Sequence, residues 1–542
     1  MLLGPGWGSA GDTNENDTTD PTTGIPGVGT LRDAGYNVVT WDPRGFGSSG
    51  GTVEVDSPQY EGRDVSAIIT WLAAQPQALL DAPGDPRVGM AGGSYGGGIQ
   101  LVSAAIDPRI DAIVPDIAWH SLVTSLDKNN TPKLGWASEL TTLGEAEGHL
   151  DPVIPQTYAT ALSGQPLSAS EVNFFATRGP GNLVSRIHIP TLLIQGTVDN
   201  LFTLQEAVTN YEILRHDGVP IKMLWFCGGH GICITNPGDT ALITQDTINW
   251  FNRYLKRDPK VNTGPTFQWV DQDGTEHTGA DYPMAAGAPL TGNGSGTLPI
   301  TEAGGAGPVT QSSTVSSPTG VSVATLAGPI APAKAQNAVN VTLPAPTGQQ
   351  FVVGAPQLTL SYQGTGSGES GASTSIYAQL VDDTTGFVLN NQITPIPITL
   401  DGNSHTITEP LEILSATDRP GEHFTLQLTA STTAYQTQHA VGTVTFSNIH
   451  VVLPTVNPKA APAGYGSVAP NGCTDAGNVK LVMPNGTRTA KAMLGQRVIA
   501  RGRRTLTIHL IGLGSRTVQI RILAHQRDGR TRTLTHRLRA CP

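Results

Sequence analysis

The run VGMAGGSYGGG at residues 88–98 decides the fold predicted for this chain. Its first four residues predict a short buried strand, and the residues that follow Gly96 predict a helix with an apolar face. Between them, GGSYG at residues 92–96 fits the pattern G-x-S-x-G, which holds a serine on a tight strand-to-helix turn. Glycines two residues either side of the serine relieve the steric clash of that turn. This context makes Ser94 a candidate nucleophile rather than part of a plain glycine-rich turn.

Strands and helices alternate on both sides of this run. Residues 1–3 read as the end of a strand, residues 37–41 and 110–115 as further strands, and residues 60–74 as a helix between them. This β-α-β-α-β order predicts a parallel sheet covered by helices. The same rhythm returns downstream, where the sequence predicts strands at residues 191–195 and 221–226 and helices at residues 204–215 and 240–255.

The remaining sequence divides by composition. Helical patterns with Pro and Gly breaks at residues 118–186 predict a cap inserted into an α/β-hydrolase core made of residues 1–117 and 187–258. Short alternating runs rich in Thr, Ser, Gly and Val then predict an all-β sandwich or jelly roll at residues 259–455, in which we expect residues 285–320 to be loop-like. Residues 456–471 read as a linker and residues 472–542 as a small β domain.

The charge of the chain is unevenly distributed. Residues 461–542 contain 14 Lys and Arg but two Asp, whereas the whole chain has a net charge of −11. A basic domain on an acidic body could contact an anionic surface such as a cell-wall polymer, or it could be a solvated β domain rich in Arg. The acidic body argues against nucleic-acid binding, and no apolar run is long enough for a membrane span.

A serine nucleophile needs a base, and the base needs an acid that orients it. In α/β-hydrolases the chain order is Ser, then Asp or Glu, then His. Asp199 follows the strand at residues 191–195 and His230 follows the strand at residues 221–226. Because the carboxyl ends of parallel strands share one sheet edge, Ser94, Asp199 and His230 are predicted to meet there.

Two further groups complete the predicted site. The backbone N–H of Tyr95 and a donor from the loop LLGPGWG at residues 2–8 should form the oxyanion hole, and we choose Trp7, through its backbone N–H or its indole. Trp119 and His120, at the end of a predicted strand, are candidates for the substrate pocket. No metal or cofactor site is predicted, since the acidic loop at residues 12–20 lacks the glycine of a calcium loop.

The four cysteines fall into two pairs that are local in sequence: Cys227 with Cys233, and Cys473 with Cys541. Two disulfides in an oxidising compartment explain this pattern better than free thiols or a zinc site. We therefore expect a secreted protein whose export signal precedes residue 1.

The order GGSYGG, then GTVD, then GGHG, followed by an all-β region, resembles the cocaine esterase and X-Pro dipeptidyl-peptidase family, which includes α-amino-acid ester hydrolases and acylases. The resemblance covers about residues 1–455. It implies an α/β-hydrolase core, a helical cap and a C-terminal jelly roll, with Ser94, Asp199 and His230 as the triad. In that family a tyrosine side chain often helps to form the oxyanion hole, where the corresponding loop here offers Trp7.

The sequence therefore predicts a serine hydrolase that cleaves carboxylic esters or amides through an acyl-enzyme. An X-Pro dipeptidyl-peptidase is the alternative, and it would need a carboxylate in the cap to bind the amine of the substrate. Glu139, Glu145 and Glu147 are available for that role. A non-catalytic cell-surface binding protein on a hydrolase scaffold is a third possibility.

Overall fold

The computed structural model describes residues 1–20, 23–306, 334–367 and 373–457, and, in the basic tail, residues 478–483, 487–494, 497–503, 505–509, 517–526 and 531–539. The chain forms two compact units. The first contains Met1–Tyr282 and Ala286–Pro458, and the second contains Lys459–Pro542 with Pro283–Ala285. Each unit is described by itself.

An eight-stranded sheet forms the core of residues 1–282. Its strand order is β12-β11-β10-β9-β6-β5-β1-β2, and the neighbours pair in parallel except β11 with β12. The predicted α/β fold is therefore confirmed. The strands are β1 (Leu2–Leu3), β2 (Val39–Thr40), β5 (Val88–Gly93), β6 (Ile110–Asp116), β9 (Thr191–Gly196), β10 (Ile221–Phe226), β11 (Phe267–Val270) and β12 (Glu276–Gly279).

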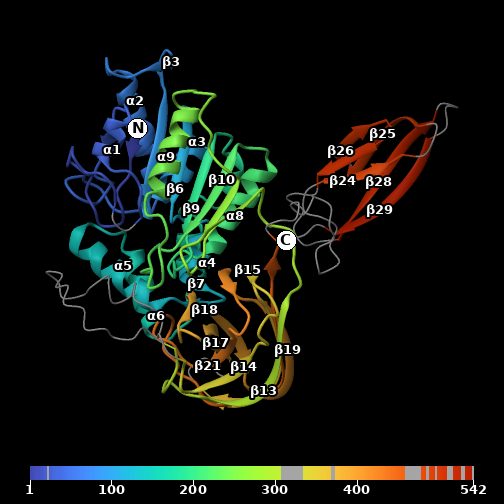
Figure 1. The fold of residues 1–542 in the computed structure, drawn as a ribbon. Helices are drawn as coiled ribbons and strands as arrows, with labels where there is room; N and C mark the ends of the chain where they lie inside the picture. The colour runs from blue at the N-terminus through green and yellow to red at the C-terminus, as the bar shows by residue number, and fades with distance from the viewer. Residues whose placement is uncertain are drawn as a thin grey trace. The chain divides into compact units, whose positions relative to one another are not determined.

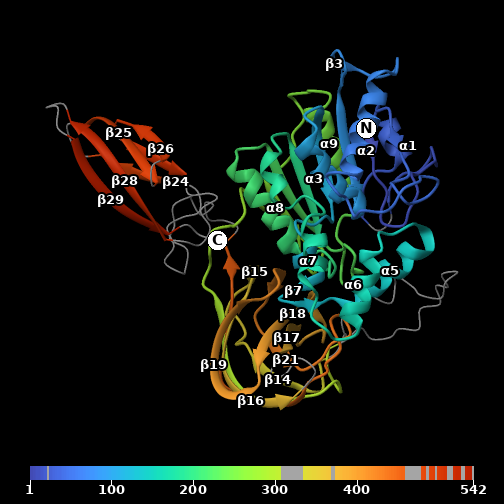
Figure 2. The ribbon, with the colours of Figure 1, turned by 180° about the vertical axis from the view of Figure 1, so that it is seen from behind.

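Helices cover both faces of this sheet. One face carries α1 (Val28–Asp33) and α9 (Leu242–Tyr254), and α9 lies in front of the sheet in Figure 1. The opposite face carries α2 (Glu61–Ala73), α3 (Tyr95–Ile106) and α8 (Leu204–His216), of which α3 and α8 lie in front in Figure 2. Strands between two helix layers bury both sides, which explains why β5, β6 and β9 are buried along almost their whole length.

The predicted cap lies between β6 and β9. It consists of α4 (Leu122–Leu126), α5 (Leu134–Glu147), α6 (Val153–Leu162), α7 (Ala169–Ala176) and the 3₁₀ helix η1 (Gly181–Arg186). A short hairpin of β7 (Asp127–Lys128) and β8 (Thr131–Pro132) joins α4 to α5. A second small hairpin, β3 (Leu80–Ala82) with β4 (Asp85–Pro86), precedes β5. No helix among the described residues is long and apolar enough to cross a membrane.

Residues 286–457, here named the β region, form antiparallel sheets around one apolar core. The all-β prediction is confirmed, while the jelly-roll topology stays a prediction. One sheet has the order β13-β22-β16-β19, the second β14-β21-β17-β18, and the third β20-β15-β23. The strands are β13 (Leu290–Ile300), β14 (Ala338–Thr342), β15 (Gln350–Gly354), β16 (Gln357–Ser367), β17 (Ser373–Asp382), β18 (Val388–Thr399), β19 (Asp401–Pro410), β20 (Leu414–Asp418), β21 (Phe424–Thr429), β22 (Val441–Leu453) and β23 (Thr455–Val456).

The loop expected at residues 285–320 is wrong for its first part, because β13 occupies Leu290–Ile300. Gly292, Gly294 and Gly296 recur at every second position of this strand. A Cβ atom on Gly294 would lie 2.5 Å from a methyl group of Val341, so these glycines let β13 lie close to β14. The glycine content that suggested a loop is thus a packing requirement inside a strand.

The basic tail unit is also made of strands. β24 (Asn478–Val482) pairs with β27 (Thr505–His509), and a second sheet has the order β26 (Arg497–Gly502), β25 (Thr487–Leu494), β28 (Thr517–Gln526), β29 (Thr531–Arg539). Apolar side chains such as Ile520 and Ile522 form its small core. The strands predicted for this tail are present, whereas Cys473 and Cys541 lie outside the described residues.

Candidate active site

Ser94 occupies a strained turn between β5 and α3. Its φ angle is 55°, a left-handed conformation that L residues rarely adopt. The two glycines of the motif face the carbonyl oxygen of Gly4, from which a Cβ atom on Gly92 would lie 2.5 Å and one on Gly96 2.2 Å. Any larger residue would collide with the backbone of the first loop, so the motif's glycines are required by close packing as well as by the turn.

The structure brings together the three side chains predicted from chain order. His230 Nε2 lies 2.8 Å from Ser94 Oγ, and His230 Nδ1 lies 2.8 Å from Asp199 Oδ2. Asp199 follows β9 and His230 follows β10, so all three residues lie beyond the carboxyl ends of parallel strands. The edge of His230 is packed by the rings of Phe202 and Trp136, which restrict its rotation.

The carboxylate of Asp199 is fully buried and accepts hydrogen bonds on both oxygens. Oδ1 accepts the backbone N–H groups of Leu201 at 3.0 Å and Phe202 at 2.8 Å. Oδ2 accepts from His230 and, at 3.4 Å, from the side-chain amide of Gln195. A carboxylate held by several donors keeps one orientation and tolerates its burial.

Glycines and a disulfide shape the loop that carries His230. Gly229 has a φ angle of 114°, and a Cβ atom on Gly231 would lie 1.9 Å from the carbonyl oxygen of Val198. The loop therefore lies directly against the Asp199 loop. The predicted disulfide between Cys227 and Cys233 is present and closes the loop around the histidine.

The two predicted oxyanion donors lie beside Ser94. Tyr95 is the first residue of α3, so its backbone N–H has no acceptor within the helix and lies at the positive end of the helix dipole. The indole of Trp7 donates to the carbonyl oxygen of Leu140 in the cap at 2.9 Å. Of the two options for Trp7, only its backbone N–H is therefore left to face an oxyanion.

An apolar pocket with a volume of about 100 Å³ lies against Ser94 between the sheet and the cap. Trp119 lines it and packs against Phe202, as predicted for a pocket residue. His120 does not line it, because its Nδ1 is bonded to Asn210 Oδ1 at 2.8 Å. The lining residues are Trp7, Val55, Ser94, Tyr95, Trp119, Leu122, Val123, Leu126, Asp127, Pro132, Ala137, Leu140, Thr141, Ile154, Thr157, Tyr158, Ala161, Leu167, Val172, Phe175, Leu201 and Phe202.

Two buried acids near the serine turn have strongly perturbed ionisation. Burial, with the nearby carboxylates of Asp20 and Asp199, raises the pKa of Asp116 well above its usual value. Burial and Glu61 do the same to the pKa of Asp56. Asp116 also accepts the backbone N–H of Ser94 on its own carbonyl oxygen at 3.0 Å. Both acids are therefore buried neighbours of the turn whose ionisation is disfavoured by their surroundings.

The β region supports the Asp199 loop from outside. The side-chain amide of Gln392 donates to the carbonyl oxygen of Asp199 at 2.8 Å. Residues 389–392 bulge out of the ladder between β17 and β18, and Asn390 and Asn391 both have a φ of 54°. Bulges redirect side chains, and asparagine tolerates the left-handed conformation that this one needs.

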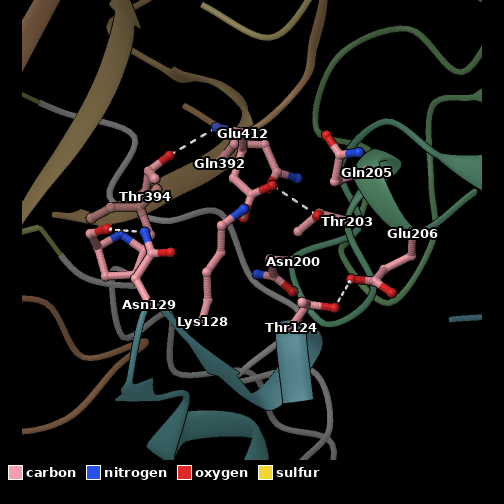
Figure 3. A network of polar contacts seen from close by, with 12 residues as sticks. Thr124, Lys128, Asn129, Asn200, Thr203, Gln205, Glu206, Gln392, Thr394 and Glu412 are labelled. Carbon is pink, nitrogen blue, oxygen red and sulfur yellow. Dashed lines mark hydrogen bonds and ion pairs between the residues drawn. The ribbon is translucent and has the colours of Figure 1, made fainter. Parts of the chain in front are cut away.

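A partly buried ion pair joins the cap to the β region, as Figure 3 shows. Lys128 Nζ lies 2.5 Å from Glu412 Oε1, and Glu412 Oε2 accepts from the hydroxyl of Thr203 at 2.8 Å. Burial alone would raise the pKa of Glu412, but Lys128 and Lys133 hold it below its usual value. The pair thus connects the cap, the start of α8 and the β region.

Lys133, at the start of α5, is fully buried next to this pair. Its ammonium donates to the carbonyl oxygens of Asn200 at 2.8 Å and Leu201 at 3.0 Å. Burial lowers its pKa to about 8. The segment that follows Asp199 is therefore held by the cap as well as by Gln392.

Sequence reasoning missed these supporting residues. Gln195 had a signal, since it is a polar residue at the end of a buried strand beside a candidate acid. Gln392 and Glu412 had none, because they are distant in sequence and resemble any polar residue of a β-rich segment.

Comparison with known proteins agrees with this architecture. Residues 7–231 match the family model described as X-Pro dipeptidyl-peptidase (S15 family). Over 116 residues the chain is 33% identical to an uncharacterized 31.7 kDa protein of the traX-finO intergenic region of Escherichia coli, covering 21% of this chain. The chain spans 38% of the length of the curated relatives it matches.

Solved structures share the fold over most of the chain. A CocE/NonD family hydrolase from Staphylococcus aureus matches with a TM-score of 0.60 at 13% identity, covering 84% of this chain and 88% of that one. An α-amino acid ester hydrolase gives 0.60 at 14%, covering 84% and 92%. An aminopeptidase from a marine sediment Thaumarchaeota archaeon gives 0.58 at 14%, with the same coverage.

The matched family model is one of peptidases, and the solved structures with this fold include hydrolases of esters. The resemblance inferred from the motifs to the cocaine esterase and X-Pro dipeptidyl-peptidase family is thus supported by the match over residues 7–231.

Proposed function

We propose that the chain hydrolyses carboxylic esters or amides through an acyl-enzyme formed on Ser94. Ser94 Oγ attacks the carbonyl carbon while His230 Nε2 takes its proton, and the same nitrogen later delivers that proton to the leaving group. Asp199 fixes the ring of His230 and stabilises the imidazolium. Water then attacks the carbonyl carbon of the acyl-enzyme. His230 Nε2 takes a proton from that water and delivers it to Ser94 Oγ as the acid product leaves. The observation that carries this proposal is the chain of two 2.8 Å hydrogen bonds from Ser94 through His230 to Asp199.

The oxyanion of the tetrahedral intermediate is assigned to two backbone donors, the N–H groups of Tyr95 and Trp7. The dipole of α3 adds to the first. Backbone donors fixed before the reaction need no reorganisation, and each such donor typically contributes about 10²–10³ in rate.

Cleavage of peptides after proline is the second candidate, and the match of residues 7–231 to the X-Pro dipeptidyl-peptidase model favours it. Secretion is proposed on the strength of the Cys227–Cys233 disulfide. Contact of the basic tail with an anionic surface is proposed from its composition alone.

A fluorophosphonate probe tests the mechanism. Ser94 should be labelled in folded protein, and Ser94→Ala should lose labelling together with at least about 10³-fold of its esterase rate. His230→Gln should greatly slow labelling although Ser94 is still present. An unlabelled, folded wild-type chain would favour the non-catalytic binding protein. Comparing Ala-Pro-p-nitroanilide with p-nitrophenyl butyrate separates the peptidase from the esterase.

A further inference from the structure

We infer that the pocket beside Ser94 accepts an uncharged, apolar acyl group, so that α-amino acyl substrates and peptides with a free N-terminal amine are poor substrates. The inference rests on the proposed function, because it assigns the acyl half of the substrate of the same serine. Its basis is the chemistry of the pocket wall.

The wall of the pocket is almost entirely apolar, and several of its polar groups are bonded elsewhere. The indole N–H of Trp7 donates to Leu140, and the hydroxyl of Thr157 donates to the carbonyl oxygen of Val153 at 2.7 Å. The hydroxyl of Tyr95 accepts the backbone N–H of Asp56 at 3.4 Å. What faces the space is mostly carbon from the cap helices and from the loop after Asp199.

The carboxylates expected to bind an amine do not line this pocket. Glu145 and Glu147 are exposed on α5, and Glu139 is buried in the same helix but is not a lining residue. Among the described lining residues, Asp127 is the one that carries a carboxyl group. Burial raises its pKa to about 6, and the neighbouring cation, Lys128, is paired with Glu412 instead.

One carboxyl group does not make an ammonium site in such surroundings. A primary ammonium has three N–H donors, and each donor that is buried without an acceptor is costly. Asp127 can satisfy one or two of them, and little other polar surface faces the space. An alkyl or aryl group, in contrast, gains affinity roughly threefold to fourfold for each methylene it buries.

The test uses two esters that differ only in the α-ammonium group: ethyl 3-phenylpropanoate and ethyl L-phenylalaninate, at pH 6.5 with full-length chain. We expect kcat/KM to be at least about 30-fold higher for the 3-phenylpropanoate. Equal or faster cleavage of the phenylalaninate would overturn the inference, as would turnover of neither ester by a chain whose Ser94 reacts with fluorophosphonate. Failure of Ser94 to react at all would instead overturn the proposed function.

Two variants locate the effect in the pocket. Asp127→Asn should leave the preference between the two esters within about threefold, and a selective loss of phenylalaninate cleavage would show that Asp127 anchors an amine. Ala161→Phe, on α6, should lower kcat/KM for p-nitrophenyl octanoate at least about tenfold more than for p-nitrophenyl acetate. Fluorophosphonate labelling reports whether this variant is folded; an unchanged chain-length preference in labelled variant would contradict the inference.

Discussion

The α/β core and the β region contribute different things to the same site. The core supplies Ser94, Asp199 and His230, each on a turn a few residues beyond a parallel strand. The β region supplies Gln392 and Glu412, which reach the site only through tertiary contact. The proposed reacting groups are thus placed by local turns, and the loop that carries Asp199 is held by residues distant in sequence.

Two neighbouring residues of the cap differ in whether the β region supplies a partner of opposite charge. Asp127 lies in the apolar pocket, and burial raises its pKa to about 6. Lys128, the next residue, points to the β region and pairs with Glu412. A buried charge is retained where a partner from the second region meets it, and is disfavoured where none does.

Removing the charge of Glu412 should have the largest effect on stability. Glu412→Gln removes the carboxylate that pairs with Lys128 and attracts Lys133, and breaking a fully buried pair costs about 3–5 kcal/mol, which is an upper bound for this partly buried one. Urea unfolding should show the loss. The double variant Glu412→Gln/Lys128→Met should recover part of it, and a wild-type midpoint in the single variant would refute a structural role for the pair.

Gln392 should affect catalysis more than folding. Gln392→Met keeps the bulk of the side chain but removes the donor to the carbonyl oxygen of Asp199, so we expect kcat to fall about tenfold with KM nearly unchanged. The matched control is Gln363→Met, which removes a similar bond to Gly402 on the exposed side of the β region. Equal effects of the two variants on kcat would contradict a specific role of Gln392 in holding the Asp199 loop.

The ionisation of Asp127 should give the smallest effect, seen in the pH dependence of stability. Its pKa is higher in the folded chain, so the folded state holds a proton that the unfolded state has lost between about pH 4 and 6. The contribution of Asp127 to the free energy of unfolding is therefore fully present below about pH 4 and is lost as the pH rises through about 6. We expect about 1 kcal/mol, less than the about 3 kcal/mol of two full pKa units because the group is partly exposed. The free energies of unfolding of the wild type and of Asp127→Asn at pH 4 and pH 7 measure this contribution. An identical pH dependence in the two proteins would contradict it.

Much of the fold could be predicted because its signals are local. The apolar runs that became β5, β9 and β10, and the helix periods that became α2 and α8, depend on neighbours within a few residues. The strand β13 could not be predicted this way. Its glycines are required because Val339 and Val341 of another strand pack against them. The sequence of β13 alone does not show these neighbours.

The candidate site also contains residues that local sequence could predict and others that it could not. Ser94, Asp199 and His230 were found because each follows a strand in a fixed chain order, and parallel topology then brings the strand ends together. His120 was chosen by the same rule, but the side chain of Asn210 on α8 turns it away from the pocket. The indole of Trp7 was likewise engaged by a carbonyl group of the cap.

The sequence by itself determined the class of fold, the serine turn and the order of the residues that meet it, because turn chemistry and strand periodicity are properties of short segments. The tertiary structure alone decided which polar groups remain free to face a substrate and which residues hold the Asp199 loop. Those outcomes depend on burial and on partners distant in sequence, such as Gln392, 193 residues from Asp199. A short segment cannot show which groups will be bonded, because a long-range hydrogen bond needs a donor and an acceptor from two different segments.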